Sequence, residues 1–379
     1  MRDFVITSLQ SWDSVFGGNA KDIAIALSVQ HRVLYINPRM SNKKKSASQL
    51  RNIKENLWVL DSNAWLLPVN YLPDGSIFDT INKYNNRKIF QEVNKYTKKL
   101  VFKKIIHFCD NDIYRSFYAH EFMHADIHIY YRRDNLHPVG YWSRHIARLE
   151  PKIIVKSDLI MCNSAALAQY AIPYKRNSWI FDIGQGVDLS AYCADIPLVV
   201  PEDCKHLVHP IVGYIGALTD FRLDIELLYQ LASERRDCTF LFIGKRENAF
   251  LNHPLCELPN VIFLGLKPME QIPAYTKAID VCLNPQIVNE VTIGNYPRKV
   301  DEYLAMGKPV VATRTQTMEL FREHVYLCST LEEYLKAIND ALENDSLEIQ
   351  RKRIAFAHTH SWAHCTEKII KAIEKYENA

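Results

Sequence analysis

The chain has 379 residues, of which 48% are hydrophobic and 23% are charged, a composition typical of a soluble globular protein. This length exceeds what a single hydrophobic core usually supports, so we expect two domains. No apolar segment approaches the roughly 20 residues that cross a bilayer, the N-terminus has no signal pattern, and no nucleic-acid-binding motif is present, so we expect a cytoplasmic protein without a nucleic-acid partner.

The net charge of +3 is unevenly distributed along the chain. Residues 1–190 carry 26 Lys and Arg against 17 Asp and Glu, a balance of +9, whereas the remainder carries a balance of −6. The basic half contains the run Lys43–Lys45 and a cluster at Lys95, Lys98, Lys99, Lys103 and Lys104. Contact with an anionic membrane surface and a plain solvated face both explain such clusters, and the sequence leaves both open.

The first half of the chain predicts a doubly wound α/β domain. A strand over 4–8, a polar loop containing Gly17 and Gly18, a helix over 19–29 and a strand over 33–37 form its opening unit. The loop lacks the G-x-G-x-x-G pattern of nicotinamide-binding domains, and its glycines either let backbone approach a ligand or form a tight turn. Low apolar content predicts a mobile loop over 40–50. Later apolar segments predict strands over 57–60, 104–109, 127–131, 159–163 and 179–183.

Polar side chains follow two of these strands. His107, Asp110 and Asp112 close one strand, and residues 132–134, which include Asp134, close the next. Because open α/β sheets bind ligands at the carboxyl ends of their strands, we predict that these side chains line one site, although each alone is an ordinary cap or loop residue. Two carboxylates spaced as in D-N-D can hold a divalent metal against a diphosphate, but we expect no metal because the second half offers a better phosphate site.

The second half repeats the alternation of strands and helices after a linker predicted over 188–210. Its predicted strands span 211–215, 240–243, 261–264, 281–284, 309–312 and 326–328. Gly216, Gly244 and Gly265 each follow a strand directly, so backbone is expected to line a pocket for a nucleobase and its phosphates. A last helix over 361–376 has an apolar face that fits either domain.

The segment 295–313, N-Y-P-R-K-V-D-E-Y-L-A-M-G-K-P-V-V-A-T, is the most informative part of the chain. It predicts a turn, a short helix, a glycine stop and a buried strand. Arg298 and Lys299 lie at the helix N-terminus, where unpaired backbone N–H groups suit an anionic group such as a phosphate. Glu302 lies on the same face and can accept two hydrogen bonds from a sugar diol; a solvated ion pair with Arg298 is the alternative.

These motifs together resemble a known family. The G-x-x-G-A-L at 213–218, the N-V-x-F-L-G at 260–265, the helix segment above and the F-D-I-G-Q-G-V-D at 181–188 are similar to those of GT-B nucleotide-sugar glycosyltransferases of the retaining family-four and family-one type. Within that family the chain is most similar to bacterial enzymes that build surface polysaccharide, including the teichuronic-acid type. The resemblance implies an α/β protein with two Rossmann-like domains facing each other across a cleft. These are an acceptor domain over 1–190, to which a helix over 361–379 crosses back, and a donor domain over 191–360.

The resemblance also implies roles for particular residues. Glu302 matches the residue that binds the donor ribose, Lys299 and Arg222 match contacts to the diphosphate, and Arg298 is a further candidate for that contact. The remaining donor-site candidates are the backbone positions Gly17, Gly18, Gly216, Gly244 and Gly265. Two positions depart from the family, with Gly294 in place of a glutamate and Ala217 in place of an arginine.

The activity implied by the resemblance is transfer of a sugar, with retention and without a metal or other cofactor. The donor would be a nucleoside diphosphate sugar, with UDP or GDP expected, and the acceptor a glycan or a lipid-linked molecule. Lys299 and Arg222 would stabilise the leaving diphosphate, and Asp134, His107 and Asp110 are candidates for orienting or deprotonating the acceptor hydroxyl. A sugar-nucleotide epimerase or phosphorylase on the same scaffold, and a non-catalytic protein that binds a sugar nucleotide or polysaccharide, are the alternatives.

Overall fold

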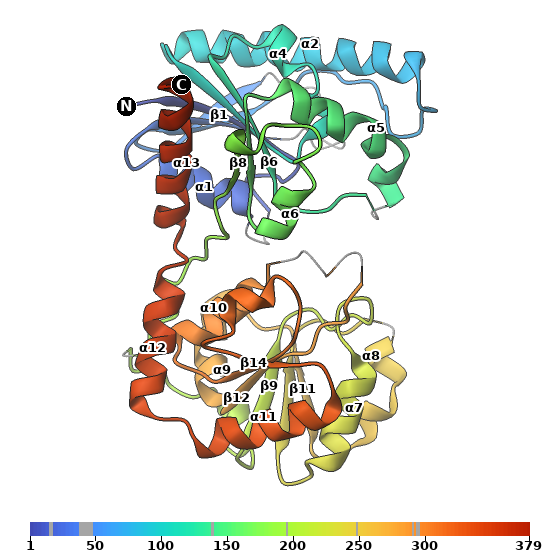
Figure 1. The fold of residues 1–379 in the computed structure, drawn as a ribbon, viewed down its shortest axis with the longest axis vertical. Coiled ribbons are helices and arrows are strands. Elements are labelled where there is room, and N and C mark those ends of the chain that lie inside the picture. Colours follow the sequence, from blue (N-terminus) through green and yellow to red (C-terminus); the bar gives the residue numbers. More distant parts are fainter. Residues whose placement is uncertain are drawn as a thin grey trace. The chain divides into compact units, whose positions relative to one another are not determined.

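The computed structural model describes residues 1–14, 18–37, 48–137, 140–194, 196–247, 249–289, 292 and 296–379. Gly17, Lys43–Lys45 and Gly294 lie outside these ranges. The chain forms two compact units: unit 1 contains Met1–Gly186 and Trp362–Ala379, and unit 2 contains Val187–Ser361. Each unit has a central, mainly parallel sheet with helices on both faces (Figure 1), so the predicted α/β class with two Rossmann-like domains is confirmed.

The sheet of unit 1 has the strand order β3-β4-β2-β1-β5-β6-β7-β8. Its neighbouring strands are parallel except for β3 and β4. The strands are β1 Asp3–Ser8, β2 Arg32–Asn37, β3 Gln49–Lys54, β4 Leu57–Asp61, β5 Ile105–Asp110, β6 Ile127–Arg132, β7 Leu159–Cys162 and β8 Ile180–Asp182. β1 and β5 are buried along their whole length, as expected for central strands covered on both faces.

Strand β3 is not indicated by the sequence pattern. The loop predicted over 40–50 is wrong at its C-terminal end, because β3 begins at Gln49. Its side chains are exposed or half-buried and it lies at the edge of the sheet, so its sequence lacks the buried face by which a strand is recognised. A turn at Asn56, whose φ is 62°, joins β3 to its antiparallel partner β4.

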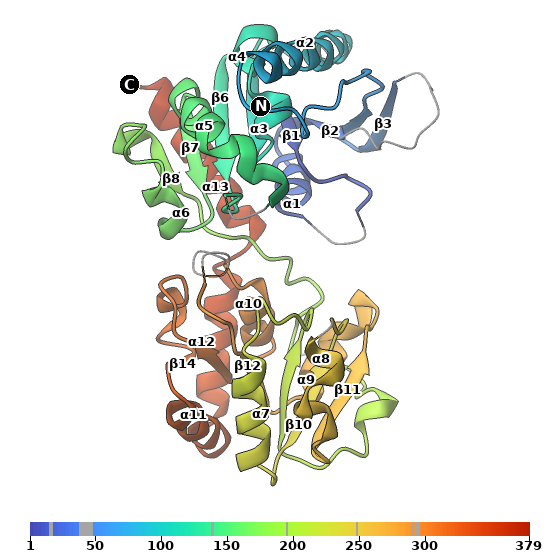
Figure 2. The ribbon, with the colours of Figure 1, turned by 90° about the vertical axis from the view of Figure 1, so that its right-hand side faces the viewer.

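Helices cover both faces of the unit 1 sheet (Figures 1 and 2). α1 and α13 lie side by side on one face, where Ile23 and Ile369 share a core with Phe4 of β1. α2 and α5 cover the opposite face. The last helix therefore packs in unit 1. The helices are α1 Asn19–Leu27, α2 Ser76–Lys99, α3 Ile113–Ser116, α4 Ala119–Phe122, α5 Gly140–Lys156, α6 Ala165–Gln169 and α13 Trp362–Glu377.

The sheet of unit 2 is parallel, with the strand order β11-β10-β9-β12-β13-β14. Its strands are β9 Ile211–Ile215, β10 Thr239–Ile243, β11 Val261–Gly265, β12 Val281–Asn284, β13 Val310–Thr313 and β14 Tyr326–Cys328. Its helices are α7 Ile225–Glu234, α8 Ala249–Asn252, α9 Ile272–Ala278, α10 Arg298–Ala305, α11 Leu331–Glu343 and α12 Leu347–His358. α9 and α10 pack on one face and α7 and α11 on the other. All six strands therefore present their carboxyl ends at one edge.

Candidate functional site

Glycine backbone forms part of the carboxyl edge of the unit 2 sheet. Gly216 follows β9 and Gly244 follows the neighbouring β10, with φ of 153° and 147°. A Cβ atom on Gly244 would lie 1.9 Å from the carbonyl oxygen of Gly216, so a side chain is excluded there. Gly265 has φ of 70°, but a Cβ atom on it would meet no atom within 4 Å. The ends of β9 and β10 therefore pack tightly at Gly216 and Gly244, where Gly244 is buried and Gly216 is half-buried.

Helix α10 is anchored beside this edge by two of its buried side chains. The backbone N–H of Ile215, the residue before Gly216, donates a hydrogen bond of 2.9 Å to the hydroxyl of buried Tyr303. Asp301 of the same helix is fully buried and lies 2.7 Å, Oδ1 to Nδ1, from His360. Burial raises the pKa of the Asp301 carboxyl, and the contact with His360 opposes that rise. Sequence reasoning missed this anchor, because His360 is distant in the chain and no local pattern pairs it with Asp301.

Lys299 extends from α10 to the glycine edge. Its ammonium donates a hydrogen bond of 2.5 Å to the Tyr214 hydroxyl and lies 4.2 Å from the centre of that ring. A Cβ atom on Gly216 would lie only 2.6 Å from the same Nζ. The structure thus brings together two predicted site residues, the cation of Lys299 and the half-buried backbone of Gly216, next to a helix N-terminus.

Glu302 follows on α10 and is half-buried. Burial raises the pKa of its carboxyl, while the charges of Arg298 and Lys299 and a hydrogen bond with Tyr192 lower it. This environment does not match the alternative of a solvated ion pair on an open helix face. The cations of the first helical turn and the carboxylate therefore share one partly buried region.

Arg222 lies on the loop after β9, where it is exposed and its guanidinium stands 5.4 Å from the ring centre of Phe221. Within the described ranges its side chain has no ion pair or hydrogen bond, so the guanidinium is open to an anionic ligand. The structure shows no contact between Arg222 and the α10 residues in the part of the chain that it describes.

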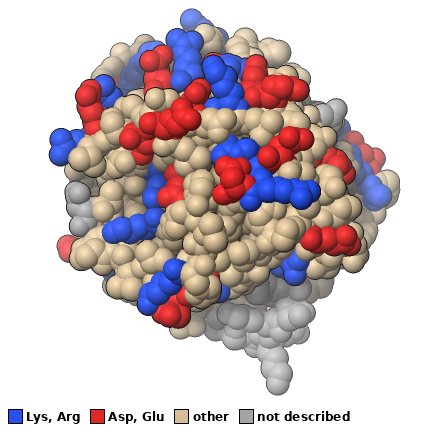
Figure 3. Space-filling view, turned by 90° about the horizontal axis from the view of Figure 1, so that it is seen from below, with Lys and Arg blue, Asp and Glu red and all other residues tan. Residues whose placement is uncertain are grey.

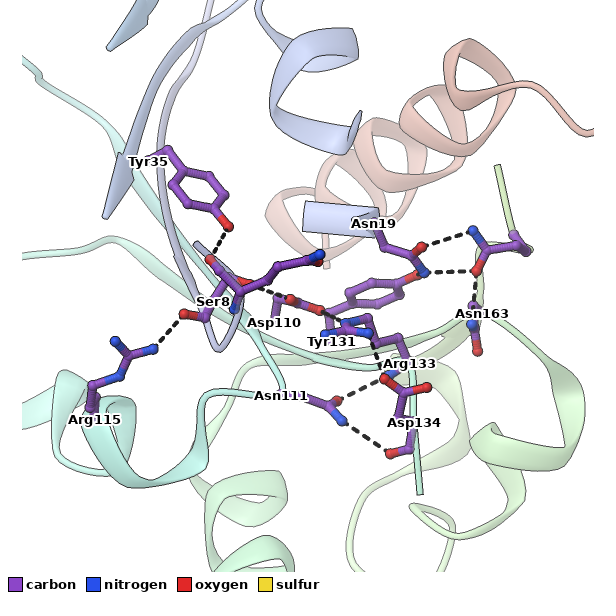
Figure 4. Close-up of polar contacts among 12 residues, drawn as sticks. Ser8, Asn19, Tyr35, Asp110, Asn111, Arg115, Tyr131, Arg133, Asp134 and Asn163 are labelled. Carbon is purple, nitrogen blue, oxygen red and sulfur yellow. Dashed lines mark hydrogen bonds and ion pairs between the residues drawn. The ribbon is translucent and has the colours of Figure 1, made fainter. Parts of the chain in front are cut away.

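Two predicted carboxylates of unit 1 meet at one arginine. Asp110 is fully buried and accepts hydrogen bonds from Ser8 Oγ at 2.6 Å and from Arg133 Nε at 2.7 Å. Arg133 also pairs with Asp134 at 2.5 Å, as Figure 4 shows. Burial raises the pKa of the Asp110 carboxyl, and Arg133 and Ser8 oppose the rise. Asp110 therefore holds Arg133 in place, while the more exposed Asp134 remains accessible at the end of the strand.

The D-N-D triplet is divided among separate partners. Asp112 pairs with Arg115 at 2.8 Å, and Arg115 also donates to the backbone carbonyl of Ser8, whose hydroxyl binds Asp110. Asn111 between them has φ of 48°; its side-chain oxygen accepts from the backbone N–H of Arg133 and its amide donates to the carbonyl of Asp134, both at 3.0 Å. Asn111 is a positioning residue that sequence reasoning missed. Among the residues that the structure describes, no group of three or more His, Cys, Asp or Glu could hold a metal.

A buried network of amides lies at the same edge (Figure 4). Asn19 Nδ2 donates to Gln185 Oε1 at 2.7 Å, and Gln185 Nε2 donates back to Asn19 Oδ1 at 3.1 Å. Asn163 Nδ2 also donates to Gln185 Oε1, at 3.0 Å, while its own Oδ1 has no partner among the described residues. Sequence reasoning found none of these three. Their identities alone carry no signal, because Asn19 and Gln185 are 166 residues apart.

His107 is not at the strand end, contrary to the sequence prediction. It lies in the middle of β5 and is buried between Thr7, 3.0 Å from its Nε2, and His128, 3.2 Å from its Nδ1. Its ring packs edge-on against Phe90 of α2, on the face of the sheet that α2 covers. The prediction failed because side chains alternate between sheet faces, and this one points into the core rather than along the strand. Orienting an acceptor hydroxyl is therefore not a role for His107.

The buried histidine pair predicts a loss of stability in acid. Burial lowers the pKa of His107 well below its usual value and lowers that of His128 to about 4. Between about pH 6.5 and 4 the unfolded chain binds protons that the folded one does not, so stability falls as pH falls, by up to about 1.4 kcal/mol per pH unit for each histidine. Urea denaturation across this range should show the decline, and His128→Gln should make it shallower. An identical pH dependence in both proteins would contradict this origin.

Gly18, the second glycine of the N-terminal loop, packs against a side chain of the protein. Gly18 precedes α1 in an extended conformation, and a Cβ atom there would lie 1.6 Å from Gln10 Oε1. Gly17 and Gly294 lie outside the described residues, so their predicted roles stay predictions. No helix in the described ranges is both long and apolar enough to cross a membrane.

Comparison with known proteins defines the class. Residues 209–344, which make up most of unit 2, match the family described as "Glycosyl transferases group 1". The resemblance stated from the sequence motifs is therefore confirmed for this domain, which contains Gly216, Gly244, Lys299 and Glu302.

Individual relatives support the same class. TuaH of Bacillus subtilis, named as a teichuronic acid biosynthesis glycosyltransferase, is 27% identical over 187 residues, which cover 48% of this chain and 47% of TuaH, so the chain spans about half of that relative. Sucrose-phosphate synthase of Thermosynechococcus elongatus has a TM-score of 0.71 at 15% identity, over 100% of both chains. HepE of Anabaena, solved in complex with UDP and glucose, has a TM-score of 0.67 at 15% identity, over 99% of this chain and 100% of its own. At such identities the solved structures show the fold alone, which is the GT-B fold.

Proposed function

We propose that the protein is a glycosyltransferase that moves a sugar, with retention of anomeric configuration, from a nucleoside diphosphate sugar to a glycan or lipid-linked acceptor. The observation that carries the proposal is the position of Lys299, whose ammonium lies beside the half-buried backbone of Gly216 in the segment that matches the group 1 family. A cation and a helix N-terminus beside a glycine at a strand end favour a diphosphate as ligand.

The chemistry follows from where charge develops. When the bond from the anomeric carbon to the diphosphate breaks, negative charge grows on the leaving phosphate oxygen. Lys299, Arg222 and the N-terminus of α10 supply positive charge to stabilise it, with Arg298 as a further contact. Glu302 accepts hydrogen bonds from the ribose hydroxyls. The side chain proposed to orient the acceptor hydroxyl is Asp134 of unit 1.

Two relatives favour finer details of this function. The HepE structure contains UDP and glucose, which favours UDP over GDP as the donor nucleotide. The name of TuaH favours a role in the synthesis of a bacterial surface polysaccharide. On this basis we propose that the acceptor is a growing glycan carried on a lipid, met at the inner face of the cell membrane.

Binding and turnover measured separately test the proposal. The shift in thermal unfolding is measured with UDP, GDP and dTDP, since a ligand at 100 times its Kd adds about 2.7 kcal/mol. Each sugar nucleotide that binds is then incubated with lipid-linked glycans, and we expect labelled sugar to appear on the acceptor. Acceptor-independent change of the nucleotide sugar would indicate an epimerase, a requirement for free phosphate a phosphorylase, and binding without turnover a non-catalytic protein.

Activity is expected to survive excess EDTA, because cationic side chains and a helix N-terminus stabilise the leaving diphosphate in place of a metal. Asp112→Asn should have a mild effect on turnover, since Asp112 is already engaged by Arg115. The measurement is initial rate with and without chelator. Loss of activity in EDTA that manganese or magnesium restores would contradict both expectations and would favour D-N-D as a metal site.

A further inference from the structure

We propose that the exposed face of α2 docks on the surface of an anionic lipid bilayer. The proposal rests on the proposed function, because a lipid-linked acceptor would bring the protein to such a surface. Beyond that function, the proposal identifies α2 as the part of the molecule that contacts the bilayer. The segment Lys43–Lys45, which lies outside the described residues, is not needed for it.

Helix α2 has one buried side and one solvent-facing side. Phe78, Ile89, Phe90 and Val93 pack into the core of unit 1. The opposite side, here called the α2 basic face, presents the exposed residues Ile77, Lys83, Tyr84, Arg87, Lys88, Lys95, Lys98 and Lys99. Because α2 has 24 residues, the face extends over about 36 Å. It is therefore a long strip of cations rather than a local cluster.

The acidic residues of α2 do not neutralise this strip. Asp79 and Glu92 are both half-buried and engaged elsewhere, Asp79 with Arg148 at 2.9 Å and Glu92 with Ser48 and Ser62. Lys83 pairs with Glu121 at 2.7 Å. Within the described ranges the cations Arg87, Lys88, Lys95, Lys98 and Lys99 have no ion pair. Their charge therefore faces solvent uncompensated and complements anionic headgroups.

Exposed aromatic and apolar side chains accompany these cations. On α2 itself, Ile77 is 60% and Tyr84 40% exposed. In the segment before the helix, Trp65 is 59% and Tyr71 85% exposed. That segment is attached to the buried side of α2, because the buried Asn85 side chain is hydrogen-bonded to both backbone groups of Leu67, at 2.9 and 2.8 Å. Tyr favours the boundary between headgroups and acyl chains, so Tyr84 and Ile77 among the cations of α2 favour a bilayer over another polyanion.

The surface of unit 2 offers a contrast within the same protein. On the face seen in Figure 3, Lys and Arg are interspersed with Asp and Glu. Lys336 of α11 pairs with Asp340, and Lys352 of α12 pairs with Glu348, each one helical turn away. Removing positive charge from α11 and α12 therefore provides a matched control for removing it from α2.

The experiment compares two triple variants of the full chain with the wild type. One carries Arg87→Gln, Lys88→Gln and Lys95→Gln, and the control carries Lys336→Gln, Arg351→Gln and Lys352→Gln, so both lose three positive charges. Sedimentation is measured with vesicles of phosphatidylcholine, with and without phosphatidylglycerol. We expect wild type and control to bind the anionic vesicles and the α2 variant to bind about tenfold less or weaker still, since each basic group near the surface contributes several-fold. Binding should also fall steeply towards about 0.5 M salt, where the Debye length is only a few Å.

The outcomes separate this inference from the proposed function. UDP binding by the α2 variant should equal that of the wild type, because no changed residue lies in unit 2. Equal vesicle binding by all three proteins, or preference for a DNA duplex over anionic vesicles at the same salt, would overturn the docking surface. Vesicle binding that depends on α2 in a protein that binds no nucleotide would leave the docking surface standing and overturn the donor site instead.

Discussion

Replacement of Lys299 by alanine is expected to lower kcat by about one to two powers of ten, with a smaller loss of affinity for UDP. The ammonium lies beside the backbone of Gly216, where we propose that the diphosphate binds. A charge-assisted hydrogen bond is worth roughly 1.5–3 kcal/mol, and this one would strengthen as negative charge grows on the leaving group. Steady-state kinetics together with equilibrium UDP binding measure the two effects separately.

A second donor-site variant and one control variant accompany this prediction. Glu302→Ala should mainly weaken UDP binding, because hydrogen bonds to the ribose are made equally before and during the reaction. Lys336→Ala removes an exposed lysine from α11 and should change neither quantity. If Lys299→Ala and Glu302→Ala both retained wild-type binding and rate, the assignment of the donor site to α10 would be wrong.

Gly244→Ala is expected to destabilise unit 2 by about 3 kcal/mol or more and to abolish nucleotide binding. The backbone there has φ of 147°, and the new Cβ atom would lie 1.9 Å from the carbonyl oxygen of Gly216. Backbone strain and steric overlap each cost about 1–3 kcal/mol, and relieving them requires the ends of β9 and β10 to move apart. Chemical denaturation and UDP titration of the purified variant measure the two losses.

Gly265→Ala is the matched control for this substitution. It lies at the same edge and also has a positive φ, of 70°, but a Cβ atom there would meet nothing within 4 Å. The variant should therefore lose only the cost of the left-handed conformation, about 1–2 kcal/mol. Equal stability of the two alanine variants would show that the close approach of Gly244 to Gly216 is not what requires glycine.

The sequence by itself determined the fold class and the candidate donor site. Runs of buried apolar residues predict strands directly when both faces of a sheet are covered, and the strand predicted over 211–215 has the bounds of β9. The donor-site signals are equally local. Glycines directly after strands and two cations at a helix start are readable because backbone geometry and helix capping depend on a few consecutive residues.

The tertiary structure alone decided the arrangement around Asp110 and the role of His107. Ser8 and Asp110 are 102 residues apart, and no periodicity indicates that one would donate to the other. Histidine is a residue type common in active sites, yet the alternation of side chains along β5 directs the His107 side chain into the core. The sequence pattern also did not indicate the exposed edge strand β3, which lacks a buried face, or the pairing of Asn19 with Gln185, which are 166 residues apart. Local sequence encodes burial, periodicity and turns, whereas a polar contact between distant segments exists only once the sheet has set its strand order and register.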